Sequence, residues 1–316
     1  MSEHLSGISV LTTAYNAGKY LQPAVESILS QTFTDFEYII VNDGSTDSTA
    51  AYLDSVKDPR LKVFHEPNRG TAGATNFGLQ FCKRKYVFRM DADDISLPTR
   101  AEKQYQFMES HPEVSLVGTQ VQMIGDESIG MEIALPLDHD RIVHALMNLN
   151  HGMCHGSCMF RNELIQRIGG YWDEHHTYDD WDMFLRISEH GALANLPEVL
   201  YHYRLLPTSL VGSNSLEMRT YYQYAVDRAL RRKEGRPAET VEGFLQQYRS
   251  RPWMKRKLDS IDVYALEQYR VANSEICHGR TVKGYGRLAW AALCSPRRTA
   301  NRISRTLARN HSSRSQ

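Results

Sequence analysis

Short apolar runs alternate with stretches of helical spacing through the first 90 residues of the chain. The apolar runs have the length of buried strands and cover residues 8–12, 36–41, 61–64 and 86–90. Between them, apolar positions recur three and four residues apart over residues 19–30, 48–56 and 72–82. Strands that alternate with helices predict right-handed crossovers and a mainly parallel sheet with helices on both faces. The pattern therefore predicts an α/β fold of the nucleotide-binding kind.

The pattern changes twice further along the chain. Two β-like runs, 114–117 and 121–124, precede a Gly125-Asp126 turn and indicate mixed-sheet strands. Helical spacing follows over residues 139–150, 161–168 and 180–189. After Tyr203 the spacing is helical from 216 to 293, and no acidic residue occurs beyond Glu275, where nine Lys or Arg do. We therefore expect an α/β domain over residues 1–212 and a helical, basic C-terminal extension over residues 213–316.

Composition excludes several classes of protein. With 316 residues, 41% of them hydrophobic, the chain can bury a substantial core. The formal net charge is zero, so no global field attracts nucleic acid. Five scattered cysteines do not resemble a disulfide framework and fit a reducing cytosol. Residues 1–7 lack the apolar core of a signal peptide, and no stretch of about 18 apolar residues is present, so we expect a cytoplasmic protein that does not span a membrane.

Three polar clusters follow directly after predicted strands, at residues 13–16, 42–45 and 91–94. In open α/β sheets ligands bind beyond the carboxyl ends of the strands, so we expect these clusters to converge on one rim. Asp91, Asp93 and Asp94 would repel one another unless a cation or solvent compensates, and Mg²⁺ or Mn²⁺ prefers such oxygen ligands. The alternative is a solvated acidic turn that caps the next helix.

The cluster after the second strand, Asn42-Asp43-Gly44-Ser45-Thr46-Asp47, also permits two interpretations. Asp-Gly and Ser-Thr-Asp are common in turns and helix caps. In the functional interpretation Asp43 accepts hydrogen bonds from a nucleobase, and Gly44 lets the backbone approach the ligand closely.

The order and spacing of five motifs closely resemble the inverting family 2 glycosyltransferases of GT-A fold. The motifs are Thr13-Ala14-Tyr15-Asn16, Gln31-Thr32-Phe33, Asn42 to Asp47, Asn76-Phe77-Gly78 and Asp91-Ala92-Asp93-Asp94. The resemblance covers residues 8–204. It implies a nucleotide-sugar half at 1–110 and an acceptor half at 111–212.

The resemblance also implies roles for individual residues. Thr13, Tyr15 and Asp43 would surround the base and ribose of the donor, although the family usually has Asp where this chain has Asn42. Asp91 would lie near the ribose or a metal-bound water, and Asp93 would be the direct ligand of Mg²⁺ or Mn²⁺.

The second half of the chain supplies a candidate general base. Asp179-Asp180 resembles the acidic pair at the head of a helix whose second member, here Asp180, deprotonates the acceptor. By themselves the two residues would equally serve as helix cap and first turn. Arg204 matches a basic position after the last core strand and would reach the diphosphate, or else is a solvated charge.

Three further features have alternative interpretations. His151, Cys154, His155 and Cys158 have spacings compatible with Zn²⁺, but an acceptor-pocket or core role for His155 is favoured. Trp172 either stacks on a sugar ring or packs against other aromatic residues. At the basic end of the chain, the spacing predicts one helical face that carries Arg298, Arg302, Arg305 and Arg309. This pattern fits either a solvated tail or peripheral attachment to anionic lipid at the inner face of the membrane.

The resemblance predicts transfer of a sugar from a nucleotide-diphosphate donor, most simply a UDP-sugar, to a glycan or lipid-linked acceptor in cell-surface polysaccharide biosynthesis. A sugar nucleotidylyltransferase is the alternative enzyme, but residues 13–19 lack the Gly-rich, basic loop expected for a triphosphate. A non-catalytic sugar-nucleotide-binding subunit is the other alternative, and it would not need Asp91, Asp93 and Asp180 together.

Overall fold

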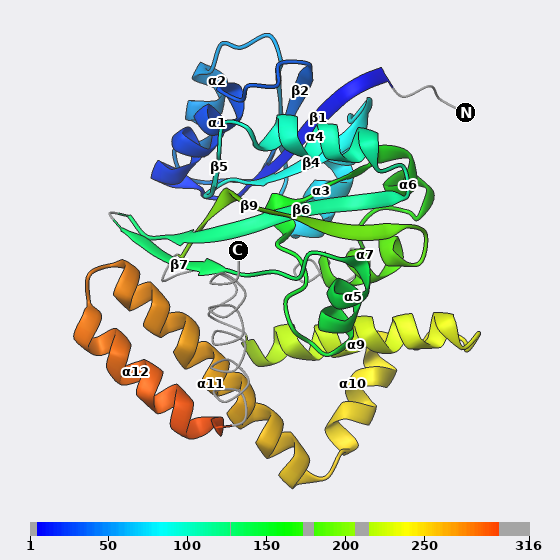
Figure 1. Cartoon of the computed structure of the whole chain (residues 1–316), viewed down its shortest axis with the longest axis vertical. Coiled ribbons are helices and arrows are strands. Elements are labelled where there is room, and N and C mark those ends of the chain that lie inside the picture. The colour runs from blue at the N-terminus through cyan, green and yellow to red at the C-terminus, as the bar shows by residue number, and fades with distance from the viewer. Residues whose placement is uncertain (1–4, 127, 173–179, 206–214, 297–316) are drawn as a thin grey trace, which may run out of the picture. The chain divides into compact units, whose positions relative to one another are not determined.

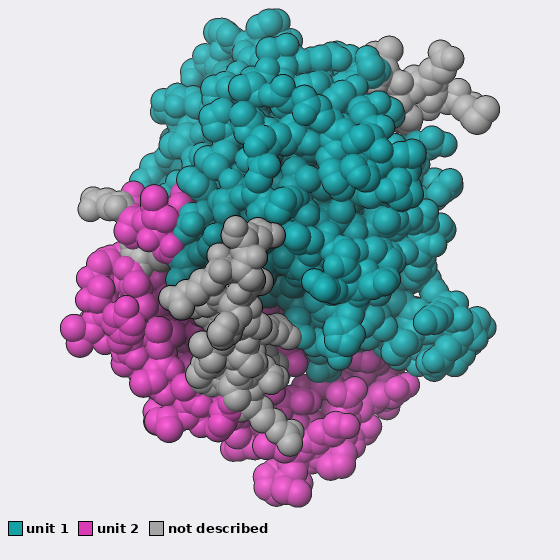
Figure 2. Space-filling view, viewed as in Figure 1, with its two compact units in different colours: residues 1–123, 131–204, 222–238 teal, residues 124–130, 205–221, 239–316 magenta. Residues whose placement is uncertain are grey.

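One mixed sheet organises the larger of two compact units (Figures 1 and 2). The computed structural model describes residues 5–126, 128–172, 180–205 and 215–296. Unit 1 comprises residues 1–123, 131–204 and 222–238, and unit 2 comprises 124–130, 205–221 and 239–316. The boundary expected between 212 and 213 lies outside the described residues, and the division made there stays a prediction.

The first half of unit 1 follows the predicted alternation. Strands β1 (Leu5–Ala14), β2 (Phe36–Asp43), β3 (Leu61–Glu66) and β4 (Arg84–Asp91) are parallel neighbours in the order β3-β2-β1-β4. The crossovers carry α1 (Leu21–Leu29), α2 (Thr49–Ser55) and α3 (Gly70–Leu79), and a single 3₁₀ turn, η1 (Gly18–Tyr20), precedes α1. The prediction from hydrophobic spacing is confirmed here.

The second half adds strands that make the sheet mixed. The short strand β8 (Met159–Arg161) runs antiparallel between β4 and β6 (Val114–Ile124), and β5 (Ile95–Ser96) is antiparallel to β9 (Ala192–Arg204) at the far edge. Strand β7 (Ile129–Ile133) pairs with β6. The two runs predicted at 114–117 and 121–124 are one continuous strand, and β5 and β8 were not predicted because two or three residues are too few to show a period.

Each face of the sheet has its own apolar core. Val10, Tyr38 and Phe88 point to the face covered by α1, α2 and α4 (Arg100–Ser110). The neighbouring residues Leu11 and Ile39 point to the opposite face. That face is covered by α3, α5 (His139–Met147), α6 (Asn162–Arg167) and α7 (Asp180–Ser188). Because both faces are buried, these strands have continuous apolar runs instead of alternating ones.

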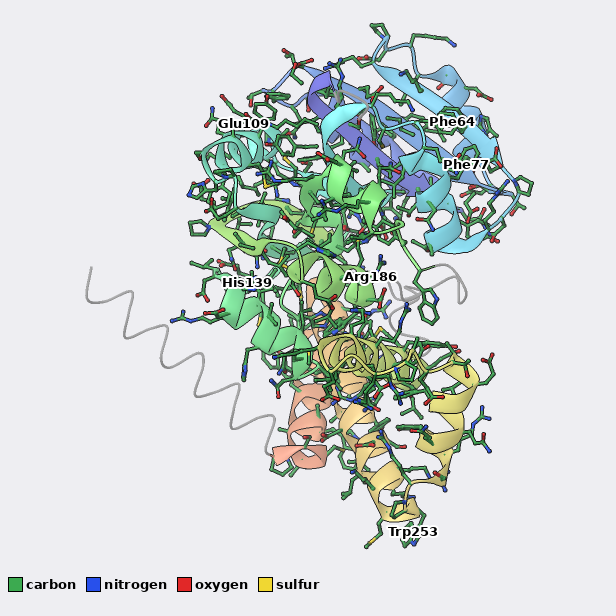
Figure 3. All side chains as sticks on the ribbon, turned by 90° about the vertical axis from the view of Figure 1, so that its right-hand side faces the viewer. Phe64, Phe77, Glu109, His139, Arg186 and Trp253 are labelled. Atoms are coloured by element: carbon green, nitrogen blue, oxygen red, sulfur yellow. The ribbon has the colours of Figure 1, made fainter. Side chains whose placement is uncertain are left out.

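The edge of the parallel half is closed by aromatic side chains. Phe64 of β3 lies edge-on to Phe77 of α3, with ring centroids 5.8 Å apart, and stacks on Phe81 at 4.1 Å (Figure 3). This packing joins α3 to the edge strand and so fixes the helix that starts beside the second polar cluster.

Helices account for most of the remaining described residues. Helix α9 (Ser215–Lys233) contributes its residues from Tyr222 onward to unit 1, while α10 (Val241–Ser250), α11 (Trp253–Cys277) and α12 (Thr281–Cys294) belong to unit 2. The prediction of a helical region from 216 to 293 is confirmed, with breaks near Gly235, Pro252 and Gly279. Within the described residues, no helix has both the length and the apolarity that crossing a membrane requires.

Candidate functional site

The three polar clusters lie next to one another at the carboxyl edge of the parallel strands. Thr13 of β1 is paired in register with Asp91 of β4, and Ala14 is paired with Asn42 of β2. The sheet therefore brings together the strand ends that the sequence singled out, as expected from parallel pairing.

A fully buried arginine orients the first carboxylate of the acidic cluster. Arg89 lies two residues before Asp91 on β4, and its Nη2 donates to Asp91 Oδ1 over 3.0 Å. Its Nη1 donates to the carbonyl oxygen of Leu11 over 2.9 Å. A buried guanidinium bound to the next strand holds the Asp91 carboxylate in one orientation. No sequence pattern signals this role, since Arg89 alternates with apolar residues of the strand.

The other two carboxylates, Asp93 partly buried and Asp94 fully buried, have little compensating charge. Burial, followed by the negative charge of Asp91, raises the pKa of Asp93 to about 6. Burial together with the carboxylates of Asp93 and Asp91 raises the pKa of Asp94 well above its usual value. Oδ1 of Asp94 accepts a 2.6 Å hydrogen bond from the backbone N–H of Arg204, whereas Oδ2 has no hydrogen-bond partner in the described part of the chain.

This donor set fits a hard divalent cation. Mg²⁺ and Mn²⁺ are commonly held by one or two carboxylates, with substrate phosphate and water completing the shell. A cation beside Asp93 would supply the charge that the buried oxygens lack. Among the residues that the structure describes, no group of three or more His, Cys, Asp or Glu side chains is arranged to hold a metal.

Arg204 lies directly beside this cluster. Its Nε donates to the backbone carbonyl oxygen of Asp93 over 2.8 Å, and its guanidinium carbon is 4.8 Å from the ring centroid of Tyr20. The end of β9 is thus hydrogen-bonded to the acidic turn. The positive charge of the Arg204 guanidinium lies beside the turn, where it could contact an anionic ligand.

The loops after β1 and β2 are cross-linked by hydrogen bonds. The backbone N–H of Asn16 donates to Ser45 Oγ over 2.9 Å, and Asn16 Oδ1 accepts from the N–H of Thr46 over 2.8 Å. Asp43 is buried, and its Oδ1 accepts from the N–H of Arg69 at the start of α3 over 2.7 Å. Tyr15 is 55% exposed beside these loops. The exposed ring of Tyr15 and the hydrogen-bonded loops suit the binding of a planar base. Asp43 would then accept hydrogen bonds from both the Arg69 N–H and the ligand.

Asn42, the departure from the usual family motif, has a structural explanation. Its Oδ1 accepts from the N–H of Ser45 over 3.2 Å, and its Nδ2 lies 2.9 Å from His65 Nδ1. His65 Nε2 is in turn 3.1 Å from Asp54 Oδ1. An amide that donates to Nδ1 leaves the ring proton on Nε2, facing Asp54. An amide can donate to Nδ1 in this tautomer, which a carboxylate could not do.

Asp180 is the first residue of α7, and it has the electrostatic surroundings of a base. Burial, with a further contribution from the carboxylate of Asp91, raises its pKa to about 6, against the lowering effect of the helix backbone N–H groups. The interaction with Asp91 brings the candidate base and the acidic cluster into one electrostatic unit. Asp179 lies outside the described residues.

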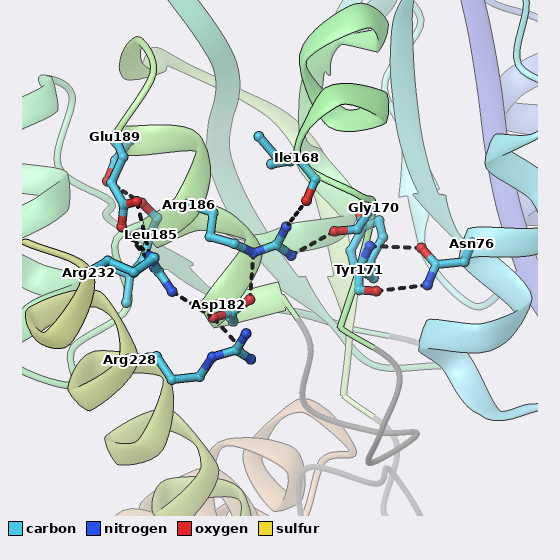
Figure 4. Close-up of polar contacts among 11 residues, drawn as sticks. Asn76, Ile168, Gly170, Tyr171, Asp182, Leu185, Arg186, Glu189, Arg228 and Arg232 are labelled. Carbon is cyan, nitrogen blue, oxygen red and sulfur yellow. Dashed lines mark hydrogen bonds and ion pairs between the residues drawn. The ribbon is translucent and has the colours of Figure 1, made fainter. Parts of the chain in front are cut away.

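The segment that leads toward Asp180 is clamped from two sides (Figure 4). Asn76 of α3 binds both backbone groups of Tyr171: Nδ2 donates to the carbonyl oxygen and Oδ1 accepts from the N–H, each over 2.8 Å. Arg186 of α7 donates to the carbonyl oxygens of Ile168 and Gly170 over 2.8 and 2.6 Å. The clamp joins α3 of the first half of unit 1, through residues 168–171, to α7, which begins at Asp180. The sequence marked Asn76 as part of a motif without indicating this contact.

Asp182 anchors the same helix to α9. It is 1% exposed, and its Oδ2 accepts from Arg186 Nε over 2.7 Å. Its Oδ1 lies 3.6 Å from a guanidinium nitrogen of Arg228 and from one of Arg232 (Figure 4). The Arg228 guanidinium also lies 4.6 Å from the ring of Trp172, whose ring centroid is 5.3 Å from that of Tyr224. Trp172 is thus packed against aromatic and cationic neighbours, in agreement with the second of its two interpretations.

His155 has a core position beside the acidic cluster. It is held by a 2.7 Å contact between its Nε2 and the Tyr171 hydroxyl, and burial lowers its pKa well below the usual value. A Cβ on the following residue, Gly156, would come within 2.5 Å of Asp91 Oδ2, so only glycine fits there. Cys158 Sγ donates to the carbonyl oxygen of Cys154 over 3.1 Å. Through these contacts the segment from Cys154 to Cys158 packs beside Asp91.

The comparisons with known proteins agree with this geometry. The profile of "Glycosyl transferase family 2" matches residues 9–169. An uncharacterized glycosyltransferase of Haemophilus influenzae is 31% identical over 63% of this chain and 65% of its own length. The amylovoran biosynthesis glycosyltransferase AmsE of Erwinia amylovora is 35% identical over 68% of this chain and 80% of its own length.

Solved structures show the same fold at lower identity. S. aureus TarS (residues 1–349) in complex with UDP-GlcNAc has a TM-score of 0.61 at 16% identity, over 93% of this chain and 92% of that one. The mannosyltransferase PcManGT of Pyrobaculum calidifontis, in complex with GDP-Man and Mn²⁺, has a TM-score of 0.53 at 16% identity, over 97% and 81%. These likenesses show the GT-A fold, and the profile and the relatives show that the chain belongs to glycosyl transferase family 2.

Proposed function

We propose that the protein is an inverting glycosyltransferase that moves a sugar from a nucleotide-diphosphate donor to an acceptor hydroxyl. The observation that carries the proposal is the shared electrostatic unit of Asp91, Asp93 and Asp180. Asp180, with a pKa of about 6, lies close enough to Asp91 for their charges to interact, and Asp91 in turn raises the pKa of Asp93. A nucleotidylyltransferase would have no use for such a base, and a non-catalytic subunit would not need base and cluster together.

In the proposed reaction the acceptor hydroxyl attacks the anomeric carbon as the bond to the diphosphate oxygen breaks. The bonding electron pair leaves with the diphosphate, and Asp180 takes the proton of the hydroxyl, so the configuration at the anomeric carbon inverts. A carboxylate with a pKa of about 6 is ionised at neutral pH yet basic enough to accept the proton.

Asp93, with Asp91 oriented by Arg89, would hold Mg²⁺ or Mn²⁺. The ion, when bound, would neutralise charge that develops on the leaving diphosphate. Arg204 would add a second positive charge from the end of β9, where its contact with the carbonyl oxygen of Asp93 keeps it close.

For the donor we favour a UDP-sugar bound by Thr13, Tyr15 and Asp43. Support comes from the TarS complex with UDP-GlcNAc, while the PcManGT complex with GDP-Man keeps GDP-sugars open. The AmsE relative supports a role in cell-surface polysaccharide biosynthesis, with a glycan or lipid-linked acceptor. We further propose a cytoplasmic protein whose basic C-terminal residues, including Arg298, Arg302, Arg305 and Arg309, attach it to the inner face of the membrane; these residues lie outside the described part of the chain.

Calorimetric titration of UDP, GDP and dTDP with and without Mn²⁺ tests the donor site. We expect one nucleotide to bind only with the metal and to lose binding in Asp93→Ala, while the exposed control Asp140→Asn binds like wild type. A folded wild-type protein that binds none of the three nucleotides would refute the proposal.

A further inference from the structure

Helix α12 has an exposed apolar face within unit 2. Its opposite face packs on α11: a Cβ on Gly284 would lie 2.9 Å from the carbonyl oxygen of Ala272, and Ser295 Oγ donates to Asp262 Oδ1 over 2.8 Å. Gly284 approaches the later turns of α11 and Ser295 an earlier one, so the two helices are antiparallel and the orientation of α12 in this unit is fixed (Figure 1).

The outward face consists of residues three or four positions apart, which one side of a helix presents together. They are Val282, Tyr285, Ala289 and Leu293, and all are exposed. Val282 and Leu293 are 86% and 73% exposed, and Trp290 at the margin is 52% exposed. An apolar stripe along the outside of a helix is the reverse of the usual amphipathic arrangement, in which the outer face is polar.

The charged side chains of α12 itself have one sign. Helix α12 contains Lys283 and Arg287 and no acidic residue. The Arg287 guanidinium donates to Gln268 Oε1 of α11 over 2.6 Å, which holds it on the flank of the helix and away from the apolar stripe. The sequence continues without an acidic residue from Glu275 to its last residue. A partner for this face should therefore be apolar at its centre and anionic around it.

The length of α12 favours a helix that lies on a membrane surface over one that spans the membrane. The 14 residues of α12 are about 21 Å long, which is less than the hydrocarbon thickness of a bilayer, about 30 Å. Tyr285 and Trp290 are the side-chain types that prefer the boundary between headgroups and acyl chains. A helix with these residues, an apolar stripe and basic flanks lies in the plane of a membrane.

We propose that the outward face of α12 docks on an anionic lipid surface. Val282, Tyr285 and Leu293 enter the acyl boundary, while Lys283 and Arg287 contact the headgroups. This surface is separate from the basic residues beyond 296, and the inference does not depend on the transferase reaction.

The test is sedimentation of the full chain with phosphatidylcholine vesicles that do or do not contain phosphatidylglycerol. We expect binding only to the anionic vesicles, and a decrease at high salt. The triple variant Val282→Ser, Tyr285→Ser, Leu293→Ser should bind at least about tenfold more weakly, because its apolar stripe is gone. A double variant with Lys283→Glu and Arg287→Glu should also lose binding.

Matched variants separate this surface from the exposed apolar side chains of β7 and from the basic end of the chain. Ile129→Ser with Met131→Ser removes exposed apolar side chains of β7 and should bind like wild type. A variant with Arg298→Gln, Arg302→Gln, Arg305→Gln and Arg309→Gln reports on the basic end alone. Unchanged nucleotide binding and thermal midpoint would show that the triple variant is folded.

Three outcomes would overturn the proposal: no wild-type binding to anionic vesicles, wild-type binding by the folded triple variant, or a lipid-free oligomer that the triple variant abolishes. The last result would assign the face to a second copy of the chain. Failure of the transferase proposal would appear separately, as loss of nucleotide binding in a protein that still binds vesicles.

Discussion

The two halves of unit 1, which the proposed function assigns to the donor side and the acceptor side, build their parts of the candidate site in different ways. On the donor side, each polar cluster follows its own strand directly, and parallel pairing alone places Thr13 beside Asp91 and Ala14 beside Asn42. On the acceptor side, Asp180 begins a helix whose Arg186 binds the carbonyl oxygens of Ile168 and Gly170. Asn76 binds the adjacent Tyr171, 95 residues later in the chain. The strand ends of the first half carry their site residues directly, whereas the helix that begins at Asp180 depends on side-chain contacts with other segments, so substitutions should affect the two halves separately.

The largest effect should come from Asp180, the proposed base. Asp180→Asn keeps the size of the side chain but cannot take a proton, so we expect sugar transfer to fall about 10³-fold. Nucleotide binding should be unchanged, because the donor-side loops are built without Asp180. Initial rates and calorimetry on the same preparation check this, with Asp140→Asn as the exposed control. A loss of less than about tenfold would remove Asp180 from the mechanism.

The largest loss of stability should come from breaking the ion pairs of Asp182. Asp182→Asn leaves the guanidinium groups of Arg186, Arg228 and Arg232 around a neutral side chain, and breaking such a buried ionic group costs about 3 to 5 kcal/mol. Urea unfolding measures this loss.

Asp227→Asn is the matched control, because Asp227 and Arg231 form the same (i, i+4) pair at a partly exposed position. It should cost less than about 1 kcal/mol. Equal costs for the two variants would contradict the anchoring role of Asp182.

Weakening the hydrogen bonds between Asn76 and Tyr171 should have a smaller effect on sugar transfer. Asn76→Asp can still accept from the N–H of Tyr171 but presents a carboxylate to its carbonyl oxygen. We expect kcat/KM for the acceptor to fall about tenfold while the donor KM stays unchanged. Asn148→Asp at the exposed end of α5 should leave both constants alone. A change confined to the donor KM would place Asn76 in the wrong half of the site.

The smallest effect concerns pH. The folded-state pKa of Asp93, about 6, lies above the unfolded value of about 4, so protonation favours the folded state at low pH. That stabilisation is lost as pH rises from about 4 to about 6, where ionised carboxylates repel. Mn²⁺ should therefore raise the thermal midpoint by about 5 °C at pH 8 and much less at pH 5. Asp93→Asn should remove the difference, and an equal effect at both pH values would argue against a metal at this carboxylate.

Some features of unit 1 could not have been predicted. Strands β5 and β8 have two and three residues and exist because β9, β4 and β6 offer them partners. Arg89 alternates with apolar residues in the sequence, and only the structure shows that its guanidinium holds Asp91. Asp180 and Asp182 belong to the same short acidic run, but the helix directs them to different surroundings. Asp182 forms buried ion pairs, whereas Asp180 is the candidate base.

Local spacing in the chain was enough to specify the order of strands and helices in the donor half, the polar residues at each strand end and the helical nature of the C-terminal region, because these depend on a few neighbouring residues. Packing of distant elements set the elevated pKa values of Asp93 and Asp180, the clamp between Asn76 and Tyr171, and which face of α12 stays exposed. Burial and electrostatic coupling depend on distances between residues far apart in the chain, and those distances exist only once the sheet and its helices have packed.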